Sequence, residues 1–149
     1  MLNKDYKEML QCLLSRRVRF LVVGAYAMGA HGYPRATGDL DIWVEPSPEN
    51  SAKVYQTLLD FKAHLAEIDQ KTFARPGVIF QIGLAPRRID IITKIDGVDF
   101  KKAYPKRKSV DVENLKIPFL SKADLIKNKS STGRDKDNLD VRYLKQRQS

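Results

Sequence analysis

The sequence predicts an α/β (α+β) fold, in which a mixed β-sheet is flanked by helices. Short apolar runs rich in Val and Ile have the length of buried strands, and stretches with apolar residues at helical spacing lie between and after them. The chain has 149 residues, of which 42% are hydrophobic, so it suits one domain with its own core. We therefore expect a single domain over 1–149, comprising an N-terminal helix (1–17), an α/β core (18–118) and C-terminal helices (121–146).

The first third of the chain should form a helix, a strand, a short helix and a second strand. Apolar residues recur at helical spacing over 3–15, so this helix is expected to cover one side of the core. Residues 19–23, RFLVV, have the β-branched content of a strand. A helix over about 25–31 follows and ends at Gly32, because glycine readily adopts the left-handed conformation. Residues 39–45 form the next strand.

The middle of the chain predicts a longer helix and then a hairpin. Ser47 followed by Pro48 is typical of a helix start, with Ser as N-cap and Pro at the first helical position. An apolar stripe follows, and we expect a break near 62–64. The segments VIFQIGL (78–84) and RRIDIIT (87–93) are strand-like and are joined by an Ala-Pro turn, so they should pair as a hairpin.

The C-terminal third begins with a basic stretch and ends in helices. The segment KKAYPKRK (101–108) is the densest in Lys and Arg and is expected to be exposed to solvent. Residues 109–117 predict one or two short edge strands. A capping-box pattern opens a helix over about 121–130, and Gly133 separates it from a last helix over about 135–145.

Composition limits the classes of protein to which the chain could belong. Twenty-seven Lys and Arg against 18 Asp and Glu give a net charge of +9, which favours polyanions such as nucleotides or RNA. No apolar run reaches the roughly 18–20 residues of a membrane-spanning helix, and the first fifteen residues lack the apolar core of a signal peptide. A single cysteine, Cys12, excludes an intrachain disulfide. We expect a cytoplasmic protein with no membrane segment.

Two carboxylates on the second strand are the main candidate for chemistry. Side chains alternate along a strand, so Asp39 and Asp41 share one face and lie roughly 7 Å apart. Two such like charges raise each other's pKa, a cost that a bound cation removes. Trp43 shares their face by the same alternation. It could line a nucleotide pocket, but packing beneath the last helices is the favoured interpretation.

Two further features point to phosphate chemistry, provided that the strand after Asp39 neighbours the strand 87–93. The turn at Gly24-Ala25 leaves backbone N–H groups free at a helix start and lets a phosphate approach closely. Asp90 interrupts an apolar strand and needs a partner if buried, for which a metal is a candidate. With Asp39 and Asp41 it could hold Mg²⁺ (or Mn²⁺), which prefers carboxylates together with phosphate oxygens. Such a triad, with Asp90 as base for an attacking hydroxyl, suits nucleotidyl transfer.

The motif resembles that of the DNA polymerase β-like nucleotidyltransferase superfamily. The family pattern is an apolar residue, Gly, Gly or Ser, about nine to thirteen residues, then Asp, apolar, Asp or Glu, apolar. Here it reads VGA at 23–25, thirteen residues, and DLDI at 39–42, with Asp90 matching the third carboxylate. The resemblance implies that the turn binds the triphosphate and that the three aspartates hold the metals. Ala25 departs from the pattern, since a Ser there would offer a hydroxyl to the phosphates.

The chain looks most similar to the minimal bacterial AbiEii-like toxins and related uncharacterised branches. Its loop GYPRATGDLD and its closing segment DLIKNKSSTGRDKDNLDVRYL resemble theirs. The resemblance implies that Lys129 and Arg134 approach the phosphates, whereas Asp137 and Asp140 are structural or orient these cations. Surface charges near helix ends are an equally open interpretation of Lys129 and Arg134.

Arg35 and Thr37, in the loop before the acidic strand, also have two open interpretations. They could contact phosphate, or they could be a solvated arginine beside a turn-forming threonine. Both are kept as candidate nucleotide-binding residues.

The leading hypothesis is a Mg²⁺-dependent nucleotidyltransferase that moves an NMP from an NTP (ATP, GTP or CTP) to a hydroxyl and releases pyrophosphate. The surplus charge of 101–108 suggests RNA as acceptor, and the toxin-like resemblance implies tRNA. One alternative is a catalytically weak member of the same fold that serves as a binding or antitoxin-like partner. Another is a basic RNA-binding module, and a protein partner or a homodimer is compatible with each.

Overall fold

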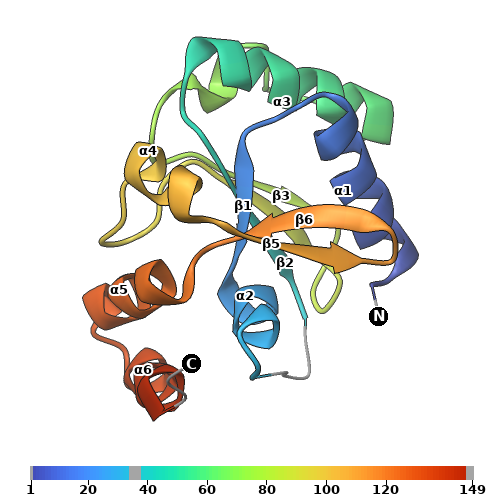
Figure 1. Ribbon diagram of the computed structural model, residues 1–149. Coiled ribbons are helices and arrows are strands. Elements are labelled where there is room, and N and C mark those ends of the chain that lie inside the picture. The colour runs from blue at the N-terminus through green and yellow to red at the C-terminus, as the bar shows by residue number, and fades with distance from the viewer. Residues whose placement is uncertain (1, 34–37, 147–149) are drawn as a thin grey trace.

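One mixed sheet forms the centre of the computed structural model, which describes residues 2–33 and 38–146 (Figure 1). Its strands are β1 Phe20–Val23, β2 Leu40–Val44, β3 Ile79–Ile82, β4 Ile89–Ile92, β5 Lys108–Val112 and β6 Leu115–Phe119. Their order across the sheet is β3-β4-β2-β1-β6-β5. The central strands β1 and β2 run antiparallel, whereas β2 pairs in parallel with β4 and β1 with β6. The sheet confirms the predicted α/β (α+β) class.

The described residues also form six α-helices and two short 3₁₀ helices. These are α1 Lys4–Ser15, α2 Gly24–Ala30, α3 Pro48–Phe61, η1 Thr72–Ala74, α4 Phe100–Ala103, η2 Tyr104–Lys106, α5 Lys122–Thr132 and α6 Asp135–Gln146. In Figure 1, α3 lies at the top and packs against α1, which runs down the right side of the sheet, whereas α5 and α6 lie at the lower left, near α2. Within the described part of the chain, no helix is long and apolar enough to cross a membrane.

The helix boundaries follow the capping signals of the sequence. The hydroxyls of Ser47 and Ser121 each accept a hydrogen bond from a backbone N–H three residues ahead, which satisfies a donor that has no partner within the helix. Helix α3 ends at Lys62 and α5 at Gly133, both in the left-handed conformation. The predicted break near 62–64 and the separation of the last two helices are therefore confirmed.

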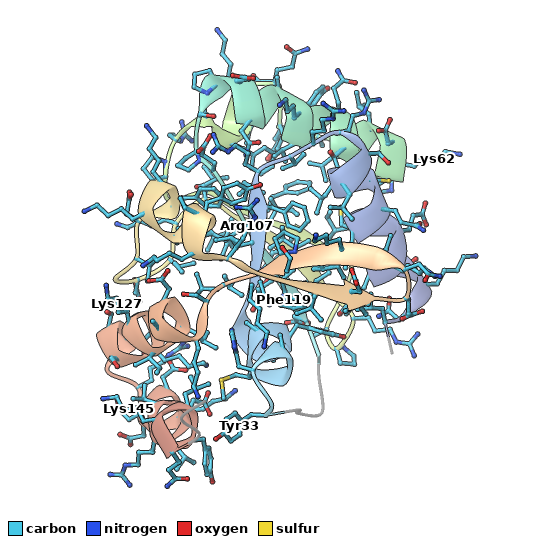
Figure 2. The ribbon with its side chains drawn as sticks, in the orientation of Figure 1. Tyr33, Lys62, Arg107, Phe119, Lys127 and Lys145 are labelled. Atoms are coloured by element: carbon cyan, nitrogen blue, oxygen red, sulfur yellow. The ribbon has the colours of Figure 1, made fainter. Side chains whose placement is uncertain are left out.

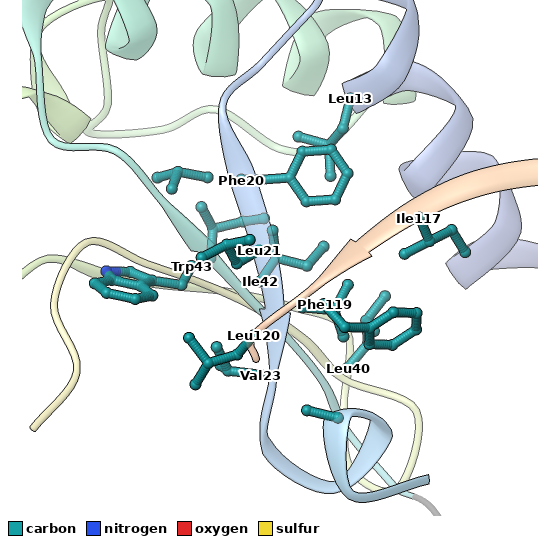
Figure 3. Close-up of a cluster of buried hydrophobic side chains, with 14 of the residues drawn as sticks. Leu13, Phe20, Leu21, Val23, Leu40, Ile42, Trp43, Ile117, Phe119 and Leu120 are labelled. Atoms are coloured by element: carbon teal, nitrogen blue, oxygen red, sulfur yellow. The ribbon is translucent and has the colours of Figure 1, made fainter. Parts of the chain in front are cut away.

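The hydrophobic core lies between the sheet and the helices α1 and α3 (Figure 3). Strand β1 is buried on both faces, which explains why its four residues are all apolar. Strand β2 places Leu40, Ile42 and Val44 on one face, and all three are buried. This dense packing fixes β2, so the side chains on its opposite face are held on a rigid support.

The opposite face of β2 carries Trp43, which packs differently from the prediction. Its ring meets the ring of Phe100 edge-on, with centroids 5.0 Å apart. Phe100 belongs to α4 and not to the last two helices, under which Trp43 was expected to pack. After β4, the chain turns back through a bridge between Ile95 and Val98, and this turn precedes the helix that bears Phe100.

The basic segment 101–108 is exposed, as predicted, but it is not an extended loop. It forms the end of α4, the 3₁₀ helix η2 and the first residue of β5. Arg107, labelled in Figure 2, lies with its guanidinium 4.1 Å from the centroid of the Tyr104 ring. Lys62, Lys127 and Lys145 point outward from the periphery in the same view. Positive charge is therefore spread widely over the surface.

Candidate active site

Strands β2 and β4 bring the predicted carboxylates together. The two strands are parallel neighbours, and Asp41 lies directly opposite Asp90 in their register. Asp39 precedes β2 by one residue. The condition stated for the sequence motif, that these two strands be adjacent, is met. The three aspartates, with Arg88, are called the carboxylate cluster below.

Gly24 lies against the carboxylate of Asp41. It has a φ of +71°, and a Cβ atom built on it would lie 2.4 Å from the Oδ2 atom of Asp41. Any other residue would therefore be strained in its backbone and would also collide with the carboxylate. Among the residues that the structure describes, no side chain caps α2, so the backbone N–H groups of its first turn have no side-chain partner there. The glycine thus places a donor-rich turn directly beside an aspartate.

The carboxyl group of Asp41 has a raised pKa. Burial raises its pKa to about 6, with further increases from the nearby carboxylates of Asp90 and Asp39. The guanidinium of Arg88 acts in the opposite direction but does not cancel these effects. An additional cation beside Asp41 would stabilise its ionised form.

Arg88 is a member of the cluster that the sequence analysis missed. Its Nη2 atom lies 2.9 Å from Oδ2 of Asp39, and its Nε donates to Oδ1 of Asp90 at 2.8 Å. A second bond from Nη2 to Asp90 at 3.1 Å makes that pair bidentate. The hydrogen bond to Asp90 is the main reason why the pKa of Arg88 is raised. The available signal was its position two residues before Asp90, which places both on one face of β4.

The cluster supplies suitable atoms for a divalent cation but is not a finished metal centre. Among the residues that the structure describes, no group of three Asp, Glu, His or Cys side chains is arranged to hold an ion. Arg88 instead pairs with the carboxylates of Asp39 and Asp90. Three carboxylates against one guanidinium still leave excess negative charge, and their oxygens are the ligands that Mg²⁺ prefers. The donor set is therefore chemically compatible with Mg²⁺ or Mn²⁺, although Arg88 now pairs with two of the three carboxylates.

Tyr6 is a second residue that sequence reasoning did not connect with the site. Its hydroxyl donates to the carbonyl oxygen of Gly38 at 2.6 Å and lies 3.2 Å from that of Arg88. Burial, together with the charges of neighbouring Tyr26 and Asp39, raises its pKa to about 12, so it stays a donor. Helix α1 therefore joins the two chain segments that lead into the acidic strands.

Helices α5 and α6 contribute a second charged group, which we call the α5–α6 network. Its members are Lys129, Thr132, Arg134, Asp137 and Asp140. The ammonium of Lys129 lies 2.8 Å from Asp140 and 3.3 Å from Asp137, and all three side chains are at least nine-tenths buried. Arg134 pairs with Asp137 at 2.7 Å and is 74% exposed.

The network is balanced electrostatically. Burial acts to raise the pKa of Asp137, but the Thr132 hydroxyl, the Lys129 ammonium and Arg134 outweigh it, and the pKa lies below its ordinary value. Asp137 therefore pairs with both cations and Asp140 with Lys129, which is compatible with either the structural or the orienting part that the resemblance implied for them. The distances do not decide whether these cations also contact phosphate, which stays a prediction.

A cavity of about 650 Å³ joins the two charged groups. It is lined by Gly24, Ala25, Asp39, Asp41, Lys129 and Arg134, among others. Six of the predicted site residues thus face one space, whose volume suits a small-molecule ligand. Asp90 is linked to it through Arg88 and Asp39. Arg35 and Thr37 lie outside the described residues, so their predicted role is not addressed.

The solved structures of several nucleotidyltransferases share this fold. A protein of Thermotoga maritima, for which nucleotidyltransferase activity has been inferred, superposes with a TM-score of 0.62 at 18% identity, over 99% of this chain and 97% of its own. The lincosamide adenylyltransferase LnuA, solved with lincomycin bound, gives 0.58 at 17% identity over 97% of each chain. The antibiotic-resistance factor ANT(2'')-Ia gives 0.63 at 13% identity over 94% of this chain and 80% of that one.

These similarities show the fold, and the identities are too low to transfer an activity. Neither protein-family models nor curated proteins give a match. The chain therefore has a nucleotidyltransferase-like fold, in agreement with the superfamily resemblance seen in its sequence.

Proposed function

We propose that this protein is a nucleotidyltransferase that uses Mg²⁺ or Mn²⁺ to transfer an NMP from an NTP to a hydroxyl group, with release of pyrophosphate. The observation that carries the proposal is the pairing of Asp41 with Asp90 across two parallel strands, with Gly24 pressed against Asp41. The fold shared with nucleotidyltransferases, including two antibiotic-modifying ones, supports it.

The residues of the cavity have distinct parts in this proposal. Backbone N–H groups of the turn at Gly24 and Ala25 bind phosphate oxygens, and the balanced cations Lys129 and Arg134 face the same space. Asp39, Asp41 and Asp90 would hold the metal, which when bound neutralises charge on the phosphates and orients the reacting oxygens. Arg88 must release Asp90 before that carboxylate can take the proton of the attacking hydroxyl.

Calorimetry with each NTP provides the test, in the presence of Mg²⁺ and again with a chelator. We expect saturable binding that needs the metal, and we expect Asp41→Asn to lose it. Ala25→Ser should tighten binding by up to roughly 1.5–3 kcal/mol, because it adds a hydroxyl at the turn. Incubation with labelled NTP and total cell extract then identifies the class of acceptor. Metal-independent binding, or none, would contradict the proposal.

A binding module without transferase activity is the second candidate. Arg88 favours it, because a guanidinium already neutralises Asp39 and Asp90 without a metal. Such a module binds nucleotide but leaves the label on the NTP in the extract assay. An antitoxin-like role belongs to this candidate.

RNA as the acceptor has weaker support from the structure. In the basic segment, Lys106 pairs with the buried Asp124 at 3.1 Å, and the ammonium of Lys108 donates to the carbonyl of Ala30 at 3.2 Å. Arg107 stacks on Tyr104. Each of these cations has a partner inside the protein, so less of the charge is surplus than the sequence suggested. RNA binding through 101–108 is kept as the alternative to a small acceptor.

A further inference from the structure

A second large cavity is lined by residues that follow the carboxylates along β2 and β4. It measures about 620 Å³ and is lined by Trp43, Lys94, Ile95, Val98, Phe100 and Lys101, among others. We call it the Trp43 cavity. Its lining combines apolar side chains with a few polar groups, which is typical of sites for small molecules.

The cavity of the candidate active site and the Trp43 cavity both adjoin a third, smaller space. This space of about 260 Å³ shares Gly24 and Asp41 with the first and Lys94 and Ile95 with the second. Asp41 and Trp43 lie on the same face of β2, two residues apart. A ligand in the Trp43 cavity could therefore extend a substituent to the carboxylates.

The proposed reaction requires the acceptor hydroxyl to reach the carboxylates. Phosphoryl displacement proceeds in line, so the attacking hydroxyl approaches from the side opposite the departing pyrophosphate. The turn at Gly24 and the α5–α6 network border the cavity that would hold the triphosphate. The smaller space between the two cavities is bordered by Lys129 and Arg134 as well as by Lys94 and Ile95, so it adjoins both the triphosphate side and the Trp43 cavity.

Trp43 carries a buried hydrogen-bond donor, its indole N–H. It is 2% exposed, and its Nε1–H has no hydrogen-bond partner in the described part of the protein. A buried donor without a partner costs free energy, which an acceptor atom on a ligand would recover. Figure 3 shows the indole nitrogen on the side of the ring that faces away from Leu21 and Ile42. The nitrogen is covered in the free protein, so a ligand reaches it by displacing a side chain of the lining.

We propose that the Trp43 cavity is the acceptor subsite and that the acceptor is a small molecule with an apolar ring and a hydroxyl group. The ring packs on Trp43, Val98 and Phe100, and an oxygen of the ligand accepts the Nε1–H. The acidic groups nearby are already engaged, since Glu45 pairs with Arg19 at 3.5 Å and Asp99 caps α4. This assignment rests on the proposed transferase function.

The transfer balances without any further reactant. The hydroxyl oxygen forms a bond to the α-phosphorus of the NTP, and the bond from that phosphorus to the oxygen of pyrophosphate breaks. The hydroxyl proton passes to a carboxylate of the cluster. The products are the nucleotidylated ring compound and pyrophosphate.

The single tryptophan of the chain makes the test direct. Benzyl alcohol serves as the probe and glycerol, which has hydroxyls but no ring, as its control. Both are titrated while the indole resonance of Trp43 is followed in a ¹H–¹⁵N spectrum. Val98→Phe fills the cavity, and Val112→Phe, at an equally half-buried valine on β5, is the matched variant. NTP binding is measured separately by calorimetry.

We expect benzyl alcohol to shift the Trp43 resonance saturably, and glycerol to leave it unchanged. Val98→Phe should weaken the response about tenfold, whereas Val112→Phe should preserve it. Absence of a saturable shift, or equal responses in both variants, overturns the inference even if NTP binds normally. A shift without any NTP binding overturns the transferase proposal and, with it, the acceptor role. A short single-stranded RNA that competes with benzyl alcohol would overturn the assignment to small molecules.

Discussion

The carboxylate cluster and the α5–α6 network face the same cavity but differ in their balance of charge. In the cluster, three carboxylates meet one guanidinium, and the pKa of Asp41 is raised to about 6. In the network, two carboxylates meet two cations, and the pKa of Asp137 is lowered. The difference teaches that the network is complete within the protein, whereas the cluster has capacity for one more positive charge. A metal-dependent site needs uncompensated negative charge beside a stably folded part of the protein.

The largest change in stability should come from removing a positive charge from the α5–α6 network. Lys129→Met leaves two buried carboxylates without their shared cation, and we expect a loss of roughly 3–5 kcal/mol in the free energy of unfolding. Urea denaturation measures it. Lys136→Met, at an exposed lysine that lines the same cavity, is the control and should change stability little. A loss below about 1 kcal/mol would show that Lys129 does not complete the network.

Removing one negative charge from the carboxylate cluster should stabilise the protein. Asp41→Asn removes a carboxylate whose pKa is raised by burial, so in metal-free buffer we expect a gain of up to roughly 3 kcal/mol at pH 7. The same variant should lose metal-dependent nucleotide binding.

The pH dependence gives an independent check on Asp41. The folded protein holds the proton of Asp41 more tightly than the unfolded chain does, since its pKa is about 6 against an ordinary 3.8. Metal-free wild-type protein should therefore lose stability as the pH rises from about 4 to about 6. Asp41→Asn should lack this component, so the two proteins should converge near pH 4. A variant less stable than the wild type at pH 7 would indicate a structural role for the carboxylate.

Removing Arg88, the single cation of the cluster, should leave the negative charge of the carboxylates less compensated. Arg88→Gln leaves Asp39 and Asp90 without their ion pairs, and we expect a destabilisation of about 1–3 kcal/mol in metal-free buffer. Added Mg²⁺ should restore more stability to this variant than to the wild type, because the carboxylates no longer have Arg88 as a partner. Thermal unfolding with and without Mg²⁺ measures the difference. Arg87→Gln, at the exposed neighbouring residue, should show neither effect.

The smallest effect should come from the support beneath the cluster. Tyr6→Phe removes the hydrogen bond to the Gly38 carbonyl, at a cost of about 0.5–1.5 kcal/mol in stability. Affinity for NTP with Mg²⁺ should also fall, because Gly38 immediately precedes Asp39. Calorimetry on this variant and on Tyr55→Phe, a tyrosine of α3, separates the two consequences. Unchanged nucleotide affinity would limit Tyr6 to a role in folding.

The sequence by itself determined most of the elements and the pair of aspartates on one face of β2. Apolar periodicity and capping residues are local signals, so the helices, the hairpin and the starts at Ser47 and Ser121 were predictable. The alternation of side chains along a strand placed Asp39 and Asp41 on one face. The nucleotidyltransferase resemblance also rested on local spacing, namely the thirteen residues that separate the Gly24-Ala25 turn from Asp39.

Only the tertiary structure decided which partners these residues have. The pairing of β2 with β4 brought Asp90 opposite Asp41 and delivered Arg88 as a counter-cation, whereas the sequence alone had suggested a metal. Tyr6 reaches Gly38 across 32 residues, and Trp43 lies under Phe100 instead of the last helices. Such contacts depend on strand order and on the path of the connecting turns. The physical reason is that burial and electrostatic balance arise from all neighbours in space, of which a sequence pattern specifies only those on the same element.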